Sequence, residues 1–391
     1  MLAPEDNTAK TPLWQRPAGL VCAFVLGAVL AALIVSATNK GASTTAPAVD
    51  APAASAQKAA DVDIATTFPS WDSQSASLAE LVAFVQGACD QASPSYIQPA
   101  DRIATFDMDG TIISEKAPMY LDYMLLIHRV LDDPNHVASG ADVAIIEQVR
   151  DYAYQGKKNS DLSADRHRIS DAEFAGMKPE EFRSYVSEFL DTEDVLGFDG
   201  MTYGGSFYKP MLEVIDYLRA NDFDVWMVSA CNREIVRGVV ARLGIEPDHV
   251  IGADIAYATT DQGEQDPADF NMGLGADVVL STPLADDCEK ANKALAIARG
   301  IGKRPILAFG NSSGDYSMLT YAETSGGMGM IVIADDVERE YGNEKKAAET
   351  TEEAAKQSWT TFSMRDDWET IYGENVVKTE LPAQEELAAA A

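Results

Sequence analysis

The stretch FDMDGT at residues 106–111 decides how this sequence is interpreted. It ends a short apolar run, residues 103–106, which is typical of a buried parallel strand that stops at a polar loop. Asp107 and Asp109 therefore stand at a strand end, two positions apart. Such a pair suits phosphoryl transfer, because the first carboxylate can attack phosphorus while the second moves a proton at the leaving oxygen. An isolated pair could also simply cap the following turn, so the interpretation depends on partners elsewhere in the chain.

A second apolar run, residues 225–228, ends at Ser229. The next residues, 231–233, have the pattern of a helix start, so the Ser229 hydroxyl and the backbone N–H of Ala230 could hold phosphate oxygens. A serine at a strand end more often caps a helix. This element gains weight only when it is combined with the others.

A third apolar run, residues 305–309, leads into GNSSGD at residues 310–315. This glycine-flanked loop carries two oxygen ligands, Asn311 and Asp315, four positions apart. Hard oxygen ligands beside a phosphate site indicate Mg²⁺. The sequence thus predicts a magnesium site at the end of this strand.

A lysine that could neutralise phosphate charge lies in the helix predicted over residues 291–299. Lys293 is the candidate, and Lys290 is the alternative. A helical lysine is ordinarily a surface residue, so neither position is decisive alone.

The apolar runs alternate with helical patterns, which predicts a doubly wound α/β fold with a parallel sheet. Residues at the carboxyl ends of its strands would then share one edge. Residues 115–208 read mostly as helix, and a crossover needs only about a dozen residues, so this segment is predicted to be an inserted helical cap subdomain. The predicted core spans residues 69–114 and 209–375, with another strand at 330–334 and a disordered tail at 376–391.

The N-terminus predicts export. Lys10 and Arg16 precede an uncharged apolar run at residues 18–37, which is long enough as a helix to cross a bilayer. The triplet VSA at residues 35–37 has the form of a signal peptidase site, so residues 1–37 are either a cleaved signal peptide or a signal anchor. The Ala-, Thr-, Ser- and Pro-rich residues 38–68 are predicted to be a disordered linker. We expect an extracytoplasmic protein that contacts a membrane only through this N-terminal segment.

Composition excludes several classes of protein. The 391 residues carry a net charge of -32, which repels phosphodiester backbones and argues against a nucleic-acid partner. The 4 cysteines are too few for a disulfide framework, and their spacing does not suggest zinc. Folding could bring Cys231 and Cys288 near the active edge, where they would either pair or remain free thiols.

In chain order, the four elements are FDMDGT, Ser229, Lys293 and GNSSGD. Together they resemble the motifs of the haloacid dehalogenase superfamily, and the helical insert makes the chain most similar to the phosphoserine phosphatase-like branch. The resemblance covers roughly residues 100–335. It implies a Mg²⁺-dependent phosphatase that acts on a small phosphomonoester through an aspartyl-phosphate. Another chemistry of the same fold, dehalogenase or phosphomutase, and a cell-surface binding protein with a decayed site remain as alternatives.

The resemblance also implies roles for individual residues. Asp107 would be the nucleophile and a metal ligand, and Asp109 would be the general acid and base, with its main-chain carbonyl on the metal. The other roles fall to residues on the later strands and the helix: Ser229 and Ala230 for phosphate, Lys293 for charge neutralisation, and Asn311 with Asp315 for Mg²⁺. Lys293 is preferred over Lys290 because it precedes Ile297 by four residues, the spacing found in relatives of this branch.

Two positions depart from the pattern of this branch. Asn311 stands where Asp is usual, which removes one negative charge from the metal site. Lys116, beside Glu115, stands where phosphoserine phosphatases carry a substrate-reading Glu. This weakens phosphoserine as the substrate and leaves a phosphocholine-like headgroup open. The charged residues Glu115, Lys116 and Arg183 are the candidates for contacts to the leaving group, since the cap must close over the phosphate.

Overall fold

The computed structural model describes residues 62–116, 118–155, 160–282 and 287–381. The predicted signal segment at 1–37 and most of the predicted linker lie outside these ranges. Within them, no helix combines the length and the apolar character that a membrane crossing requires.

A six-stranded parallel sheet forms the core, in the order β4-β3-β1-β7-β8-β9. Its strands are β1 (Ile103–Phe106), β3 (Asp224–Asn232), β4 (Val250–Ala253), β7 (Leu307–Gly310), β8 (Met328–Ile333) and β9 (Thr360–Ser363). The central strand β1 pairs with β3 on one side and β7 on the other, so the three runs expected to carry the site are neighbours. All four residues of β1 and of β7 are buried, which explains why both strands read as continuous apolar runs.

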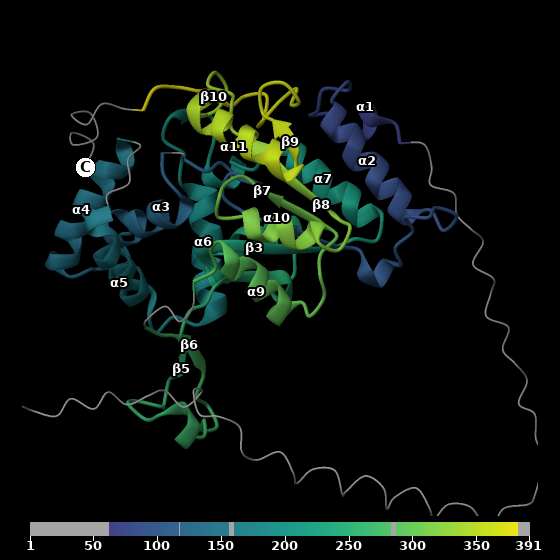
Figure 1. The fold of residues 1–391 in the computed structure, drawn as a ribbon. Helices are drawn as coiled ribbons and strands as arrows, with labels where there is room; N and C mark the ends of the chain where they lie inside the picture. The colour runs from purple at the N-terminus through teal and green to yellow at the C-terminus, as the bar shows by residue number, and fades with distance from the viewer. Residues whose placement is uncertain (1–61, 117, 156–159, 283–286, 382–391) are drawn as a thin grey trace, which may run out of the picture. The chain divides into compact units, whose positions relative to one another are not determined.

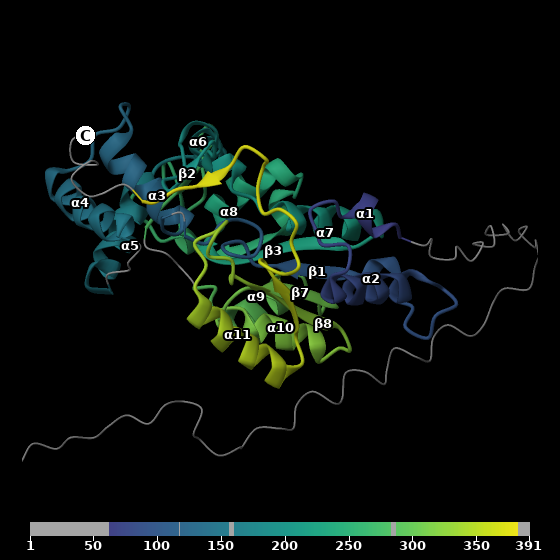
Figure 2. The same cartoon turned by 90° about the horizontal axis from the view of Figure 1, so that it is seen from above.

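Helices cover both faces of this sheet (Figures 1 and 2). One buried cluster is supplied by α2 (Ala76–Cys89), α7 (Lys209–Ala220) and α8 (Arg233–Val240). The other is supplied by α9 (Ala291–Gly300), α10 (Tyr316–Glu323) and α11 (Glu344–Gln357). The doubly wound α/β fold predicted from the sequence is therefore confirmed.

The segment between β1 and α7 is mainly helical, as the predicted insert requires. It contains α3 (Leu121–Ile127), α4 (Gly140–Tyr154), α5 (Ser163–Phe174) and α6 (Pro179–Thr192). Helix α6 packs closely on α8, because a Cβ added to Gly238 would lie 2.8 Å from Cβ of Val186. Arg242 strengthens this contact by donating to the carbonyl of Ser187 at 2.8 Å and pairing with Asp191 at 2.8 Å.

A β-hairpin that the sequence did not predict connects the core to the insert. Its strands, β5 (Tyr257–Thr259) and β6 (Val278–Leu280), pair antiparallel and project beyond the sheet in Figure 1. The amide of Leu280 donates to the carbonyl of Met177 at 2.8 Å, and the amide of Gly176 donates to the carbonyl of Leu280 at 2.9 Å. The hairpin is thus bonded through its backbone to the loop before α6.

The predicted disordered linker, residues 38–68, and the predicted disordered tail, residues 376–391, each include residues that the structure places in ordered elements. Helix α1 (Ile64–Thr67) and the fully buried Phe68 fall inside the expected linker, and the ring of Phe68 packs 5.1 Å from that of Tyr217. At the other end, β10 (Val377–Lys378) falls inside the expected tail. It pairs antiparallel with β2 (Phe198–Asp199). Local composition did not reveal either element, because the residues that each contacts are distant in sequence.

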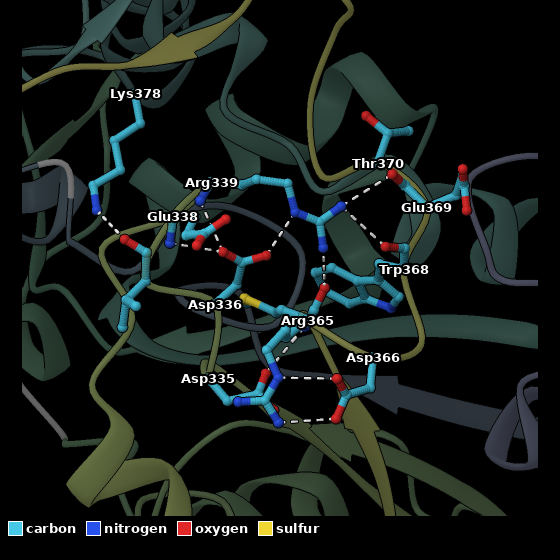
Figure 3. A network of polar contacts seen from close by, with 12 residues as sticks. Asp335, Asp336, Glu338, Arg339, Arg365, Asp366, Trp368, Glu369, Thr370 and Lys378 are labelled. Atoms are coloured by element: carbon cyan, nitrogen blue, oxygen red, sulfur yellow. Dashed lines mark hydrogen bonds and ion pairs between the residues drawn. The ribbon is translucent and has the colours of Figure 1, made fainter.

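Arg339 fixes the loop between β8 and α11 (Figure 3). Its guanidinium donates to Asp336 at 2.6 Å, to the carbonyl of Met364 at 2.7 Å, and to the carbonyls of Trp368 and Glu369, both at 3.0 Å. A single side chain therefore joins this loop to the C-terminal segment.

Candidate active site

The turn that follows β1 holds the two carboxylates of the FDMDGT stretch. The amide of Asp107 still belongs to the sheet and donates to the carbonyl of Phe309 at 2.9 Å. The chain then reverses, with the amide of Gly110 donating to the carbonyl of Ile113 at 2.8 Å. Gly110 has φ 78, and a Cβ there would lie 1.9 Å from Nδ2 of Asn311. Glycine is required at this position both for its backbone conformation and for the close approach of Asn311.

Lys293 joins the strand ends. Its Nζ donates to Oδ1 of Asp107 at 2.5 Å, to Oδ1 of Asp315 at 2.7 Å and to the carbonyl of Val228 at 2.6 Å. The side chain is buried, which alone would lower the pKa of Lys293, but the two carboxylates raise it instead. Lys290, the alternative, is exposed and lies in the turn before α9. Lys293 is therefore the lysine that the structure brings to the nucleophile.

Asp315 is positioned by the loop that carries it. Its Oδ2 accepts from the amides of Asn311 at 3.0 Å and Ser312 at 3.1 Å, so the loop folds around the carboxylate. A Cβ on Gly310 would lie 2.4 Å from Cβ of Asp315, which explains the glycine at the end of β7. Oδ1 is left to face Lys293 and the site.

Asp107 and Asp109 differ in their surroundings. Burial and the charge of Asp315 raise the pKa of Asp107 to about 7, although Lys293 opposes the shift. Burial, and then the charge of Asp107, hold the pKa of Asp109 well above its usual range. The Oδ1 atom of Asp109 is buried without a hydrogen-bond partner. A protonated Asp109 can therefore donate to a group that enters the site, which is what a general acid must do.

The last part of β3 carries Ser229 and Ala230, the residues predicted to bind phosphate. Ser229 is buried and its Oγ accepts from the amide of Cys231 at 3.1 Å, while Ala230 is exposed. Ser229 is not a helix cap, since α8 is capped by Asn232, whose side chain accepts from the amide of Glu234 at 2.9 Å. Cys231 is a free thiol, as is Cys288.

The three predicted cap contacts have different surroundings. Glu115 and Lys116 both line a pocket with Asn311, beside the nucleophile turn. Glu115 pairs with Lys346 of α11 at 3.0 Å. Its charge is therefore already balanced, which does not suit the direct recognition of a cation. Arg183 instead forms an ion pair with the buried Glu234 of α8 at 3.7 Å, so its observed contact joins α6 to the core.

Sequence reasoning missed three residues near the site. Thr111 donates to Oδ2 of Asp107 at 3.3 Å, and its place within FDMDGT could have indicated this role. The hydroxyl of Tyr120 donates to Glu115 at 3.2 Å. Lys346 follows Glu115 by 231 positions, and no local signal relates the two residues.

The donor atoms at the strand ends fit a hard divalent cation. They comprise the carboxylates of Asp107 and Asp315, the side-chain amide of Asn311 and the main-chain carbonyl of Asp109. All can offer oxygen, the donor that Mg²⁺ prefers. Clusters of three or more His, Cys, Asp or Glu suited to a metal are absent from the described ranges, so this set depends on its amide and carbonyl members.

The chain is similar to a family of known proteins and, at low identity, to solved structures. The family model described as haloacid dehalogenase-like hydrolase matches residues 104–320. Among solved structures, a protein of unknown function from Bordetella pertussis is 14% identical, with 67% of this chain and 97% of that chain covered and a TM-score of 0.41. A phosphoserine phosphohydrolase-like protein from Francisella tularensis is 14% identical, with 64% and 92% covered and a TM-score of 0.36. A search of curated proteins finds no match.

Proposed function

Because the chain belongs to the haloacid dehalogenase-like hydrolase family, we propose that it is a Mg²⁺-dependent phosphomonoesterase acting through an aspartyl-phosphate on Asp107. One observation carries this proposal. Lys293 holds Asp107 and Asp315 together at the strand ends, while the half-buried Asp109, two residues after Asp107, has one buried oxygen without a hydrogen-bond partner. A nucleophile, a neutralising cation and a proton donor thus occupy one site.

The chain's own residues account for the steps of hydrolysis. A carboxylate oxygen of Asp107 attacks phosphorus, and Asp109 protonates the oxygen of the departing alcohol. Asp109, now ionised, then takes a proton from water as the water attacks phosphorus; the bond from phosphorus to the Asp107 oxygen breaks, which releases inorganic phosphate and restores the Asp107 carboxylate. Lys293 offsets the negative charge, and the hydroxyl of Ser229 with the amide of Ala230 binds phosphate oxygens.

A magnesium ion would be held by Asp107, Asp315, Asn311 and the main-chain carbonyl of Asp109. When bound, it supplies positive charge that stabilises the phosphate and favours the ionised form of Asp107. The substrate is a small organic phosphate of the phosphoserine-like or phosphocholine-like class. Turnover of a panel of such esters by the purified protein tests the proposed activity.

Removing the metal is expected to abolish this turnover, and restoring Mg²⁺ should recover it. In addition, Asn311→Asp should tighten Mg²⁺ binding about tenfold, because it adds a negative charge to a site of hard oxygen ligands. Isothermal titration calorimetry with Mg²⁺ alone measures this without any assay of activity. Asn221→Asp is the matched control, since Asn221 ends α7 and its side chain donates to the carbonyl of Tyr217 at 2.8 Å. Weaker binding in the Asn311 variant would contradict its role as a ligand.

We also propose that the protein is exported by residues 1–37. The apolar run at 18–37 and the basic residues before it support this proposal. Fractionation of the host cell should place the phosphatase outside the cytoplasm, and N-terminal sequencing of the mature protein distinguishes cleavage after Ala37 from retention as an anchor. Recovery of the intact chain in the cytoplasm would contradict export.

A further inference from the structure

A small pocket of about 30 Å³ opens beside the nucleophile turn. Asn311, Glu115 and Lys116 line it on the side of the site, and Lys346 and Asn343 line it from α11. A Cβ on Gly110 would lie 1.9 Å from Nδ2 of Asn311 and 3.0 Å from Cβ of Glu115. The pocket is therefore contiguous with the turn that carries Asp107 and Asp109.

Lys346 lies in the first turn of α11, close to the helix dipole's positive end. The side chain of Asn343 caps this turn by accepting from the amide of Lys346 at 2.9 Å. A lysine is disfavoured there, because the N-terminal turn prefers negative charge. The carboxylate of Glu115 offsets this, with Nζ of Lys346 at 3.0 Å from Oε1 and 3.2 Å from Oε2. The position of Lys346 thus depends on an anion in the pocket.

The anion now present is one that a ligand can replace. The side chain of Lys346 is 39% exposed and that of Glu115 is 13% exposed, so a ligand can reach the lysine while the carboxylate stays largely covered. Glu115 also accepts from the hydroxyl of Tyr120 at 3.2 Å, so it keeps a partner if Lys346 turns to another anion. Lys116 adds a second positive charge to the same lining. This lining favours a negatively charged ligand over a cationic one.

We propose that Lys346 determines substrate specificity by binding an anionic group, of the carboxylate class, on the alcohol part of the phosphomonoester. This inference rests on the proposed phosphomonoesterase function. Without substrate, Glu115 is the ion-pair partner of Lys346 in the pocket. When substrate binds, its carboxylate replaces Glu115 as that partner. Helix α11 lies beyond residues 104–320, which match the family model, so this specificity belongs to the additional C-terminal part of the chain.

A pair of matched esters tests the proposal on the full-length protein. Propyl phosphate carries no charge on its alcohol part, and 3-(phosphonooxy)propanoate carries a carboxylate on the same three carbons. In Lys346→Met, KM for the carboxylate ester should rise at least about tenfold more than KM for propyl phosphate, the loss expected for a charge-assisted contact. Lys346→Arg should restore most of the difference. Glu115→Gln should lower KM for the carboxylate ester, because it removes the internal competitor.

Lys345→Met is the control, since Lys345 is 87% exposed and pairs with Glu349 at 3.8 Å on the outer face of the same helix. It should leave both KM values unchanged. Equal KM changes for the two esters in Lys346→Met, or a preference for phosphocholine in the wild type, would overturn the inference. If the wild type hydrolyses none of these esters, it is the proposed function that fails. Thermal unfolding of each variant separates a change in recognition from a loss of fold.

Discussion

Replacing Asp107 by Asn is expected to lower kcat by at least about 10³-fold. An amide does not attack phosphorus, and it attracts a metal ion far less than a carboxylate does. The substitution keeps the shape of the side chain. It also removes the repulsion between Asp107 and Asp315, which contributes to the raised pKa of Asp107. It removes the ion pair of Asp107 with Lys293 as well, but Lys293 keeps Asp315 as a partner, so we expect the variant to fold.

The measurement combines steady-state turnover of propyl phosphate with acid quenching, which traps an aspartyl-phosphate if one forms. Wild-type protein should yield the covalent species, and Asp107→Asn should not. Asp101→Asn is a matched control, because Asp101 pairs with Lys303 at 2.8 Å just before β1 and is 44% exposed. Turnover near the wild-type rate in Asp107→Asn, with the covalent species still present, would rule out the proposed nucleophile.

Replacing Asp109 by Asn is expected to lower kcat for propyl phosphate by about 10²- to 10⁴-fold, the usual contribution of a positioned acid and base. Burial and the charge of Asp107 raise the pKa of Asp109, so the resting enzyme carries the proton that an alkoxide leaving group requires. The rate of the first step in the wild type should accordingly fall as the pH rises through that pKa.

The leaving group distinguishes the two roles of Asp109. The leaving group of 4-nitrophenyl phosphate, 4-nitrophenolate, departs without protonation. Asp109→Asn should therefore still form the aspartyl-phosphate from this ester. Hydrolysis of the intermediate still lacks its general base, so the covalent species should accumulate after a burst of nitrophenol. Equal rate losses for both esters and no trapped intermediate would show that Asp109 supports the turn and does not transfer protons.

The central part of the site could be predicted because its signals are local. The strand and both carboxylates of FDMDGT lie within residues 103–111, and Asp315 follows β7 by a few residues. A parallel sheet brings the carboxyl ends of its strands to one edge, so the predicted topology also placed these strand-end residues close together. The assignment of Lys293 required information beyond the local pattern, because nothing in a helical pattern distinguishes a buried lysine from an exposed one. The spacing found in relatives supplied that information.

The surroundings of the site depend on contacts that sequence does not reveal. From the sequence, Glu115 was a candidate for binding a cationic substrate group. In the structure it pairs with Lys346, which lies in a helix far along the chain. Arg183 lies on a charged helical face, and its contact with Glu234 follows from the packing of α6 on α8. The strands β5, β6 and β10 have two or three residues each, too few for a periodic pattern to identify.

The hydrogen bonds between the β5–β6 hairpin and the loop before α6 disfavour states in which these two segments are separated. Any motion that separates Met177 from Leu280 must break the two backbone hydrogen bonds that join these segments. At about 1 kcal/mol each, their loss disfavours the separated state by roughly 30-fold. Motion that carries the hairpin along avoids this cost, but it must still break the contacts of Arg242 and Arg183 that join α6 to the core. Hydrogen exchange at the amides of Gly176 and Leu280 would then report the infrequent separation of the two segments.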